Sequence, residues 1–200
     1  MQRLLAFVFL ACSMFVVGQG CAADKNPVVV IDTSMGKIEV ELYADKAPIT
    51  VKNFLSYVND KFYDETIFHR VMNNFMIQGG GFDKKMVEKK TKGTIKNEAD
   101  NGLKNEVGTI AMARLPEPNT ASAQFFINVA NNAMLNHRDK SMEGYGYCVF
   151  GKVVAGLDVV NKIKEVATGH ANGTAWPDIQ MPMDDVPKEL VVINSIRVKE

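Results

Sequence analysis

The sequence predicts a mostly-β domain, a closed barrel or a sandwich of about eight short antiparallel strands with few helices. Apolar and polar residues alternate over short segments that are separated by Gly, Asn, Asp and Pro. This pattern is typical of strands joined by tight turns. Apolar residues recur at helical spacing in two segments, and no strand–helix–strand rhythm runs along the chain. A doubly wound parallel sheet is therefore disfavoured.

The first 23 residues are predicted to be a secretory signal peptide that is cleaved from the mature chain. Arg3 gives a charged start, residues 4–17 are almost wholly apolar, and small residues follow up to Ala23. The apolar segment is too short to span a membrane. We expect one periplasmic domain over residues 24–200, with no membrane span. Cys21 leaves open an alternative, a lipid anchor, although the leucine of a lipobox is missing before it.

The charge balance argues against a nucleic-acid-binding protein, and the cysteines argue against a disulfide-stabilised one. The chain has 23 basic and 23 acidic residues. Of these only Arg3 lies in the leader, so the mature net charge is −1. A nearly neutral chain has no general attraction to nucleic acid. Cys148 is the cysteine that remains well inside the mature domain, so we expect no internal disulfide. Stability must then come from a hydrophobic core. We also expect the protein to be a monomer.

The mature chain begins with a predicted β-hairpin and a helix. Residues 28–31 form a short apolar strand, and residues 37–43 alternate strictly after a turn. Pro48 suits the first turn of a helix because its φ is fixed near the helical value. Apolar residues then recur at helical spacing to about Asn59, which predicts an amphipathic helix over a sheet.

A second hairpin is predicted around Arg70 and Gln78. Apolar segments on both sides of Asn73-Asn74 indicate two strands, and this Asn pair is a turn signal. Arg70 and Gln78 would then lie on neighbouring strands and face the same side. The glycines at 79–81 permit tight turning and lack the lysine and hydroxyl residue of a phosphate loop.

The remaining elements follow from the same patterns. Residues 83–107 are polar and lysine-rich, which we interpret as a solvated excursion of the chain. A second amphipathic helix is predicted over residues 157–166 and a turn-rich return over residues 169–187. The remaining strands are predicted at residues 108–114, 121–129, 147–153 and 190–198.

Two segments carry a specific resemblance: FHRVMNNFMIQGGG at residues 68–81 and ASAQFFINV at residues 121–129. GTIAMAR lies between them and YCVFGKVV follows. In this order and spacing the chain resembles the cyclophilins, which are peptidyl-prolyl cis–trans isomerases, and most of all the exported bacterial type. The resemblance runs from about residue 28 to residue 198. It implies a closed eight-stranded antiparallel barrel capped by two helices, with proline-containing polypeptides as substrates.

The resemblance also implies the residues of the site. Arg70 would be the catalytic arginine, and Gln78 would be the second catalytic residue, which would hydrogen-bond Arg70 or the substrate. Ala113 and Arg114 would hold the substrate chain through their backbone groups, and Leu135 would close the pocket. The full set of implied substrate-binding residues is Phe75, Met76, Ala113, Arg114, Gln124, Phe126, Met134, Leu135 and Tyr147. No metal or cofactor is expected, because bond rotation needs no group of that kind.

Two positions depart from the family pattern. Met134 stands where many members have tryptophan, and Tyr147 stands where they have histidine. Methionine is smaller than tryptophan and has no N–H donor. We therefore expect cyclosporin-type inhibitors to bind weakly at best, and a nanomolar dissociation constant would contradict this. Arg70 is retained, so isomerase activity should survive.

Other reactive side chains have simpler interpretations. His69 precedes Arg70 on a strand and is expected to point to the opposite face with a structural, hydrogen-bonded role. With no titrating group in the mechanism, activity should be nearly flat from about pH 6 to 8. Cys148 is expected to be a buried, inert thiol. A non-catalytic peptide-binding or holdase module is the alternative function, and Arg70, which a pure binder does not need, favours the enzyme.

Overall fold

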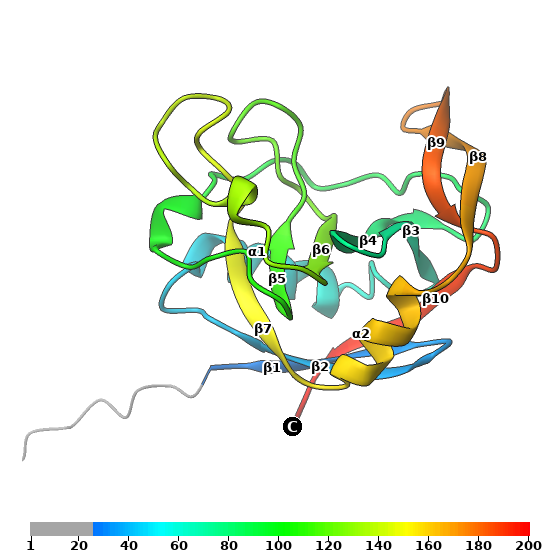
Figure 1. Ribbon diagram of the computed structural model, residues 1–200, viewed down its shortest axis with the longest axis horizontal. Coiled ribbons are helices and arrows are strands. Elements are labelled where there is room, and N and C mark those ends of the chain that lie inside the picture. The colour runs from blue at the N-terminus through cyan, green and yellow to red at the C-terminus, as the bar shows by residue number, and fades with distance from the viewer. Residues whose placement is uncertain (1–25) are drawn as a thin grey trace, which may run out of the picture.

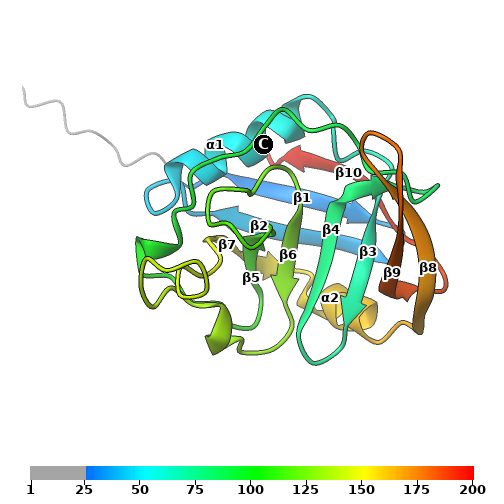
Figure 2. The ribbon, with the colours of Figure 1, turned by 90° about the horizontal axis from the view of Figure 1, so that it is seen from above.

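A computed structural model describes residues 26–200, so the predicted signal peptide and Cys21 lie outside the described part of the chain. Eight antiparallel strands close into a barrel, in the order β1-β10-β3-β4-β6-β5-β7-β2 (Figures 1 and 2). This confirms the predicted fold. The barrel strands are β1 (Val28–Thr33), β2 (Gly36–Leu42), β3 (Thr66–Met72), β4 (Met76–Asp83), β5 (Thr109–Met112), β6 (Phe125–Asn128), β7 (Val149–Ala155) and β10 (Val191–Val198).

Two helices lie on opposite sides of the barrel, as Figure 2 shows. They are α1 (Pro48–Asn59) and α2 (Leu157–Lys164). The first turn of α1 is capped from a distance, because the Glu98 carboxylate accepts hydrogen bonds from the backbone N–H groups of Ile49 and Thr50. This contact also ties the polar excursion to the barrel. Within residues 26–200, no helix is long and apolar enough to cross a membrane.

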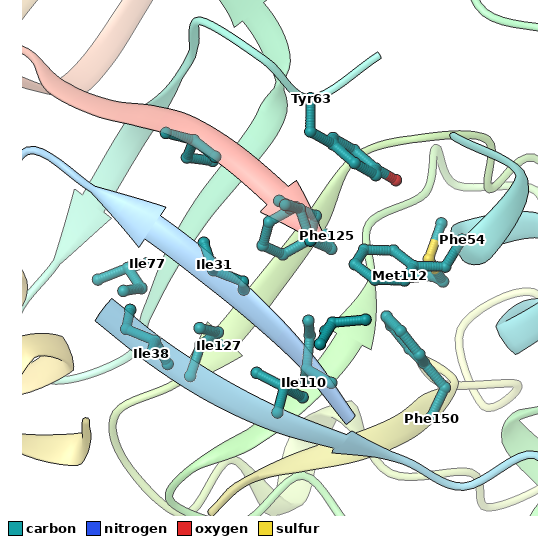
Figure 3. Close-up of a cluster of buried hydrophobic side chains, with 14 of the residues drawn as sticks. Ile31, Ile38, Phe54, Tyr63, Ile77, Ile110, Met112, Phe125, Ile127 and Phe150 are labelled. Carbon is teal, nitrogen blue, oxygen red and sulfur yellow. The ribbon is translucent and has the colours of Figure 1, made fainter. Parts of the chain in front are cut away.

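The core fills the interior of the barrel and extends under α1. Figure 3 shows isoleucines of five strands meeting there together with aromatic rings from α1, β6 and β7. Phe54 of α1 packs edge-on against Phe125 of β6, with ring centroids 5.7 Å apart. Each such side chain stabilises the fold by about 1.5–3 kcal/mol when it is fully buried. The core isoleucines in this view are Ile31, Ile38, Ile77, Ile110 and Ile127.

Two predicted elements differ in the structure. Strand β6 is shorter than the predicted 121–129, because the backbone just before it bonds to other segments: the Ala121 carbonyl accepts from Ile95 N–H and the Ala123 carbonyl from the Tyr63 hydroxyl. The predicted turn-rich return over residues 169–187 is wrong. This segment forms a second, two-stranded sheet of β8 (Thr168–Ala175) and β9 (Ile179–Pro187), which stands outside the barrel beside β3 (Figure 2).

Candidate active site

Arg70 and Gln78 are paired across the β3–β4 hairpin, as the sequence predicts. The residues that flank them point inward, since Val71 and Ile77 belong to the barrel core. Arg70 and Gln78 therefore lie on the outer surface of the barrel wall. The Arg70 side chain is 42% exposed. A rigid wall thus presents one cation and one amide side by side to solvent.

A small apolar pocket lies beside this pair. Its volume is about 120 Å³, roughly that of four water molecules in the liquid. Met76 and Phe126 are nearly fully buried within it, and Phe75, Leu135 and Tyr147 are partly buried around them. The pocket thus has apolar walls with polar groups at one rim. It is lined by Arg70, Phe75, Met76, Gln78, Ala113, Arg114, Phe126, Leu135 and Tyr147.

Alternation along β6 explains why this pocket exists. Phe125 points into the barrel core, and Phe126 points out into the pocket, where it lies opposite Ala111 of β5. Alanine at that position leaves room beside the ring. The Tyr147 ring then meets Phe126 edge-on, with centroids 5.8 Å apart. Two adjacent phenylalanines of one strand therefore serve the core and the pocket separately.

Arg114 shapes the rim of the pocket through its side chain. Its guanidinium donates hydrogen bonds to the backbone carbonyls of Leu115, Pro116, Met142 and Gly146 and lies 4.6 Å from the centre of the Tyr147 ring. One cation thus fastens two loops and one pocket wall together. The family resemblance implied only backbone contacts between Arg114 and the substrate. A lone arginine at a strand end gives no sign of which distant carbonyls it will reach.

The amides of Gln78 and Gln124 have a fixed orientation. A carboxylate can only accept hydrogen bonds, so Gln124 presents its Nε2 to Glu88, at 3.2 Å. The Oε1 of Gln124 then accepts from Gln78 Nε2, at 2.9 Å. Gln78 consequently directs its own carbonyl oxygen away from Gln124. Gly81 makes room for this arrangement, because a Cβ at that position would collide with the Gln124 side chain.

A larger groove of about 600 Å³ continues from the pocket. Arg70, Gln78, Ala113 and Arg114 line both cavities. Gln124 lines the groove but not the pocket. The groove ends at the β8–β9 sheet, where Ala175, Met181 and Met183 form part of its wall. The small pocket and the larger groove therefore adjoin each other along these four shared residues, and the β8–β9 wall belongs to the groove alone.

Comparisons with known proteins agree with this geometry. Residues 28–198 match the family described as cyclophilin type peptidyl-prolyl cis-trans isomerase/CLD. The chain belongs to this family. It is 54% identical to peptidyl-prolyl cis-trans isomerase B of Escherichia coli K12, over 86% of this chain and 100% of that protein. It is 46% identical to peptidyl-prolyl cis-trans isomerase A of Dickeya dadantii, over 98% and 97% of the two chains.

Solved structures give the same result. A cyclophilin type isomerase of Cryptosporidium parvum, crystallised in the presence of the dipeptide Ala-Pro, aligns with a TM-score of 0.68 and 25% identity. The alignment covers 86% of this chain and 99% of that one. Fold and sequence relationships together identify the chain as a peptidyl-prolyl cis–trans isomerase of the cyclophilin type.

His69 departs from its predicted place in this cyclophilin. Phe68 and Val71 both point into the core, so one extra residue is inserted between them, and the β3–β4 register shifts there. His69 and Arg70 consequently line the same groove instead of opposite faces. Burial lowers the pKa of His69 to about 4, and its Nδ1 has no hydrogen-bond partner within residues 26–200. The ring is therefore neutral near pH 7 and packs against Phe82.

The structure also places residues that sequence reasoning missed or placed elsewhere. Asp185 of β9 lies 3.8 Å from the Nε atom of Arg70, and Glu88 orients the two glutamines. Both belong to segments that were interpreted as solvated or turn-rich. Met134, implied as a substrate-binding residue, is 67% exposed and is not among the lining residues of either cavity.

The remaining candidate groups have no place in this site. Cys148 is buried, and burial raises the pKa of its thiol to about 12, so it stays protonated. Within the described residues, no group of three His, Cys, Asp or Glu side chains is arranged to hold a metal ion. The polar groups that line both cavities are thus the two guanidinium groups of Arg70 and Arg114 and the Gln78 amide, beside an apolar surface.

Proposed function

We propose that this cyclophilin accelerates rotation about X–Pro bonds in exported proteins, and that Arg70 stabilises the twisted amide above the apolar pocket. The observation that carries the proposal is the juxtaposition of the Arg70–Gln78 pair with a cavity large enough for one small apolar ring. Proline-containing polypeptides are the substrate class that fits it. The Cryptosporidium parvum relative, whose crystal structure was determined in the presence of the dipeptide Ala-Pro, supports the same class.

The reaction needs only modest assistance. Amide resonance gives X–Pro rotation a barrier of about 20 kcal/mol, which corresponds to roughly 10⁻² per second without help. A turnover of about 10 per second requires the barrier to fall by only ~4 kcal/mol. Desolvation of the amide in the apolar pocket and one charge-assisted hydrogen bond supply effects of this size.

Arginine at position 70 is well suited to donate this charge-assisted hydrogen bond. When the amide twists, its nitrogen loses resonance, becomes pyramidal and accepts a hydrogen bond better than either planar form does. A fixed cationic donor therefore binds the twisted state more tightly, which is what lowers a barrier. The guanidinium stays charged and its planar fork can also reach the neighbouring carbonyl. Gln78 adds a carbonyl oxygen to the lining of the pocket without adding charge.

The decisive experiment is a peptide isomerisation assay on wild type, Arg70→Ala and Arg70→Lys. Loss of a charge-assisted hydrogen bond of about 1.5–3 kcal/mol predicts a fall in kcat of roughly 10- to 100-fold with little change in substrate affinity. Arg138→Ala is the matched control, because it removes an exposed arginine outside both cavities. Full activity in Arg70→Ala would sink the mechanism and favour the holdase alternative.

The cellular compartment belongs to the same proposal. We infer that residues 1–23 direct export and that the mature enzyme acts in the periplasm. The leader composition and the similarity to bacterial isomerases support this. Cell fractionation and the mass of the mature N-terminus test it. Cleavage near Ala23 without a lipid is the expected result, and a lipid-modified Cys21 would replace the soluble form by an anchored one.

A further inference from the structure

The β8–β9 sheet has one face built from large residues of β9 set against small residues of β8. The cross-strand pairs are Met183 with Ala171, Met181 with Gly173, and Ile179 with Ala175. Because side chains alternate along a strand, these six residues share one face. We call this face, made of Ala171, Gly173, Ala175, Ile179, Met181 and Met183, the methionine face.

The methionine face continues the active-site groove. Ala175, Met181 and Met183 line the groove together with Arg70 and Gln78, which also line the proline-sized pocket. Beyond the groove, Ile179 is 62% exposed and Trp176 at the tip of the hairpin is 53% exposed. Apolar side chains therefore extend from the groove wall at Met181 and Met183 to the exposed Ile179 near the tip of the hairpin.

The charged groups around this groove already have partners. The Glu88 carboxylate accepts hydrogen bonds from Gln124 and from the backbone N–H of Trp176, and Asp184 lies against the His170 ring. Arg70 pairs with Asp185. Along the wall that the β8–β9 hairpin forms, the groove thus offers a bound polypeptide chiefly apolar surface. This favours bulky apolar side chains over acidic or basic ones.

The hairpin is held in position by the segment before it. Glu88 N–H donates to the Thr174 carbonyl and Thr174 N–H donates to the Met86 carbonyl, both at 2.8 Å. Lys90 lies 5.3 Å from the centre of the Trp176 ring. The backbone of the methionine face is therefore preorganised, while its methionine side chains are unbranched and can adapt to differently shaped partners.

We propose that the methionine face is an accessory binding site for bulky apolar side chains of the same unfolded polypeptide whose proline occupies the pocket. The proposal deepens the function given above and rests on it for the position of the proline. Short proline peptides would engage the pocket alone, and long unfolded chains would engage both surfaces. The hairpin would then raise the affinity for unfolded proteins without touching the chemical step.

Direct binding to this face can be read from fluorescence, because Trp176 is the single tryptophan of the chain. A proline-free, leucine-rich peptide of ten residues should change the Trp176 emission on titration, and a glycine–serine peptide of equal length should not. Met181→Gln/Met183→Gln keeps the side-chain length but makes the face polar, and should weaken binding about tenfold. Gln180→Ser is the matched control, since Gln180 pairs with Thr174 on the opposite face.

Kinetics separate the accessory site from the pocket. With a long unfolded protein as substrate, the double variant should show a KM about tenfold higher and an unchanged kcat. With a proline tetrapeptide, kcat/KM should equal that of wild type. Unchanged KM for the long substrate, or an equal loss on the tetrapeptide, would overturn the inference. If wild type failed to accelerate the tetrapeptide, the proposed isomerase function would fail instead, and the fluorescence titration would still report on the methionine face.

Discussion

Two hairpins flank the groove, and they are built in contrasting ways. The β3–β4 hairpin has barrel strands on both sides, β10 next to β3 and β6 next to β4, and its inner face is core. The β8–β9 hairpin is a two-stranded sheet outside the barrel, bridged to a preceding segment between Val87 and Thr174. One hairpin is therefore fixed on both edges and one face, while the other exposes much of its surface.

This difference separates two tasks. The group proposed to act on the amide, Arg70, sits on the hairpin whose neighbours are locked by the core, where a small displacement would be costly. The surface proposed to bind varied apolar residues sits on the two-stranded hairpin outside the barrel, which contacts the barrel at β3. Chemistry that depends on precise placement benefits from the rigid element, and recognition of diverse chains benefits from the tolerant one.

The largest expected effect concerns the buried His69 on the rigid hairpin. Its pKa is about 4 in the fold, lowered first by burial, against about 6.5 unfolded. Between pH 4 and pH 6.5, His69 is protonated in the unfolded chain but neutral in the fold. The free energy of unfolding therefore has its full value above about pH 6.5 and falls as the pH drops towards 4. The loss from this residue reaches about 3 kcal/mol. Urea unfolding of wild type and His69→Gln at pH 7 and pH 4.5 measures it.

The control for this experiment is His170→Gln, which changes an exposed histidine of the β8–β9 hairpin. It should leave the acid destabilisation of wild type intact, whereas His69→Gln should remove most of it. Equal pH dependence in all three proteins would show that His69 is not the group responsible. Isomerase activity per folded molecule should stay nearly flat from about pH 6 to 8, because His69 remains neutral there.

A matched pair of glycines gives the next largest effect. At Gly79 of β4 an added Cβ would lie 2.9 Å from the Phe68 ring and 3.0 Å from the Ile67 carbonyl oxygen, neither of which can move easily. Gly79→Ala should cost about 1–3 kcal/mol of stability. At Gly173 of β8 the added atom meets the flexible end of Met183. Gly173→Ala should therefore change stability by less than about 0.5 kcal/mol.

Thermal unfolding of the two variants would check this. For a domain of this size each kcal/mol lowers Tm by roughly 2–4 °C. Gly79→Ala should melt several degrees below wild type, and Gly173→Ala should melt close to it. Similar losses in both variants would mean that the β8–β9 hairpin is as tightly integrated as the barrel wall, which contradicts the division proposed here.

The two hairpins also differ in how well the sequence predicted them. The β3–β4 hairpin was predictable because its strands alternate, its turn carries the Asn pair, and its burial in a closed barrel enforces that pattern. The β8–β9 hairpin was missed because Gly173, Pro182 and Pro187 are residues that usually interrupt strands. They are tolerated because proline is compatible with an exposed edge strand and because glycine leaves room for Met183.

The candidate site could likewise be predicted from the sequence only in part. Most pocket residues lie in three short contiguous segments, and the resemblance implied them before the structure brought them together. Arg114, Glu88 and Asp185 act on partners that are distant in sequence, and their effects depend on how loops and the second hairpin meet the barrel. The shifted position of His69 likewise depends on one inserted residue in β3, which alternation alone does not reveal.

The smallest expected effect tests the one charged contact that joins the two hairpins. Asp185 lies 3.8 Å from Arg70 Nε, and both side chains are over a third exposed, so the pair contributes no more than about 1 kcal/mol. Its consequence should be to restrict rotation of the Arg70 guanidinium, because the carboxylate attracts the Nε side of that group. Asp185→Asn should lower kcat about threefold with KM unchanged.

The backbone at Asp185 makes this a clean substitution. Its φ is +58°, a left-handed conformation that asparagine also tolerates, so the hairpin should keep its shape. Asp184→Asn is the matched control, since the neighbouring carboxylate contacts His170 instead of Arg70. Asp185→Glu should restore part of the lost kcat, and about 1 M salt should reduce wild-type activity towards that of Asp185→Asn by screening the pair. An unchanged kcat in Asp185→Asn would mean that the barrel wall orients Arg70 alone, and that the outer hairpin contributes only binding surface.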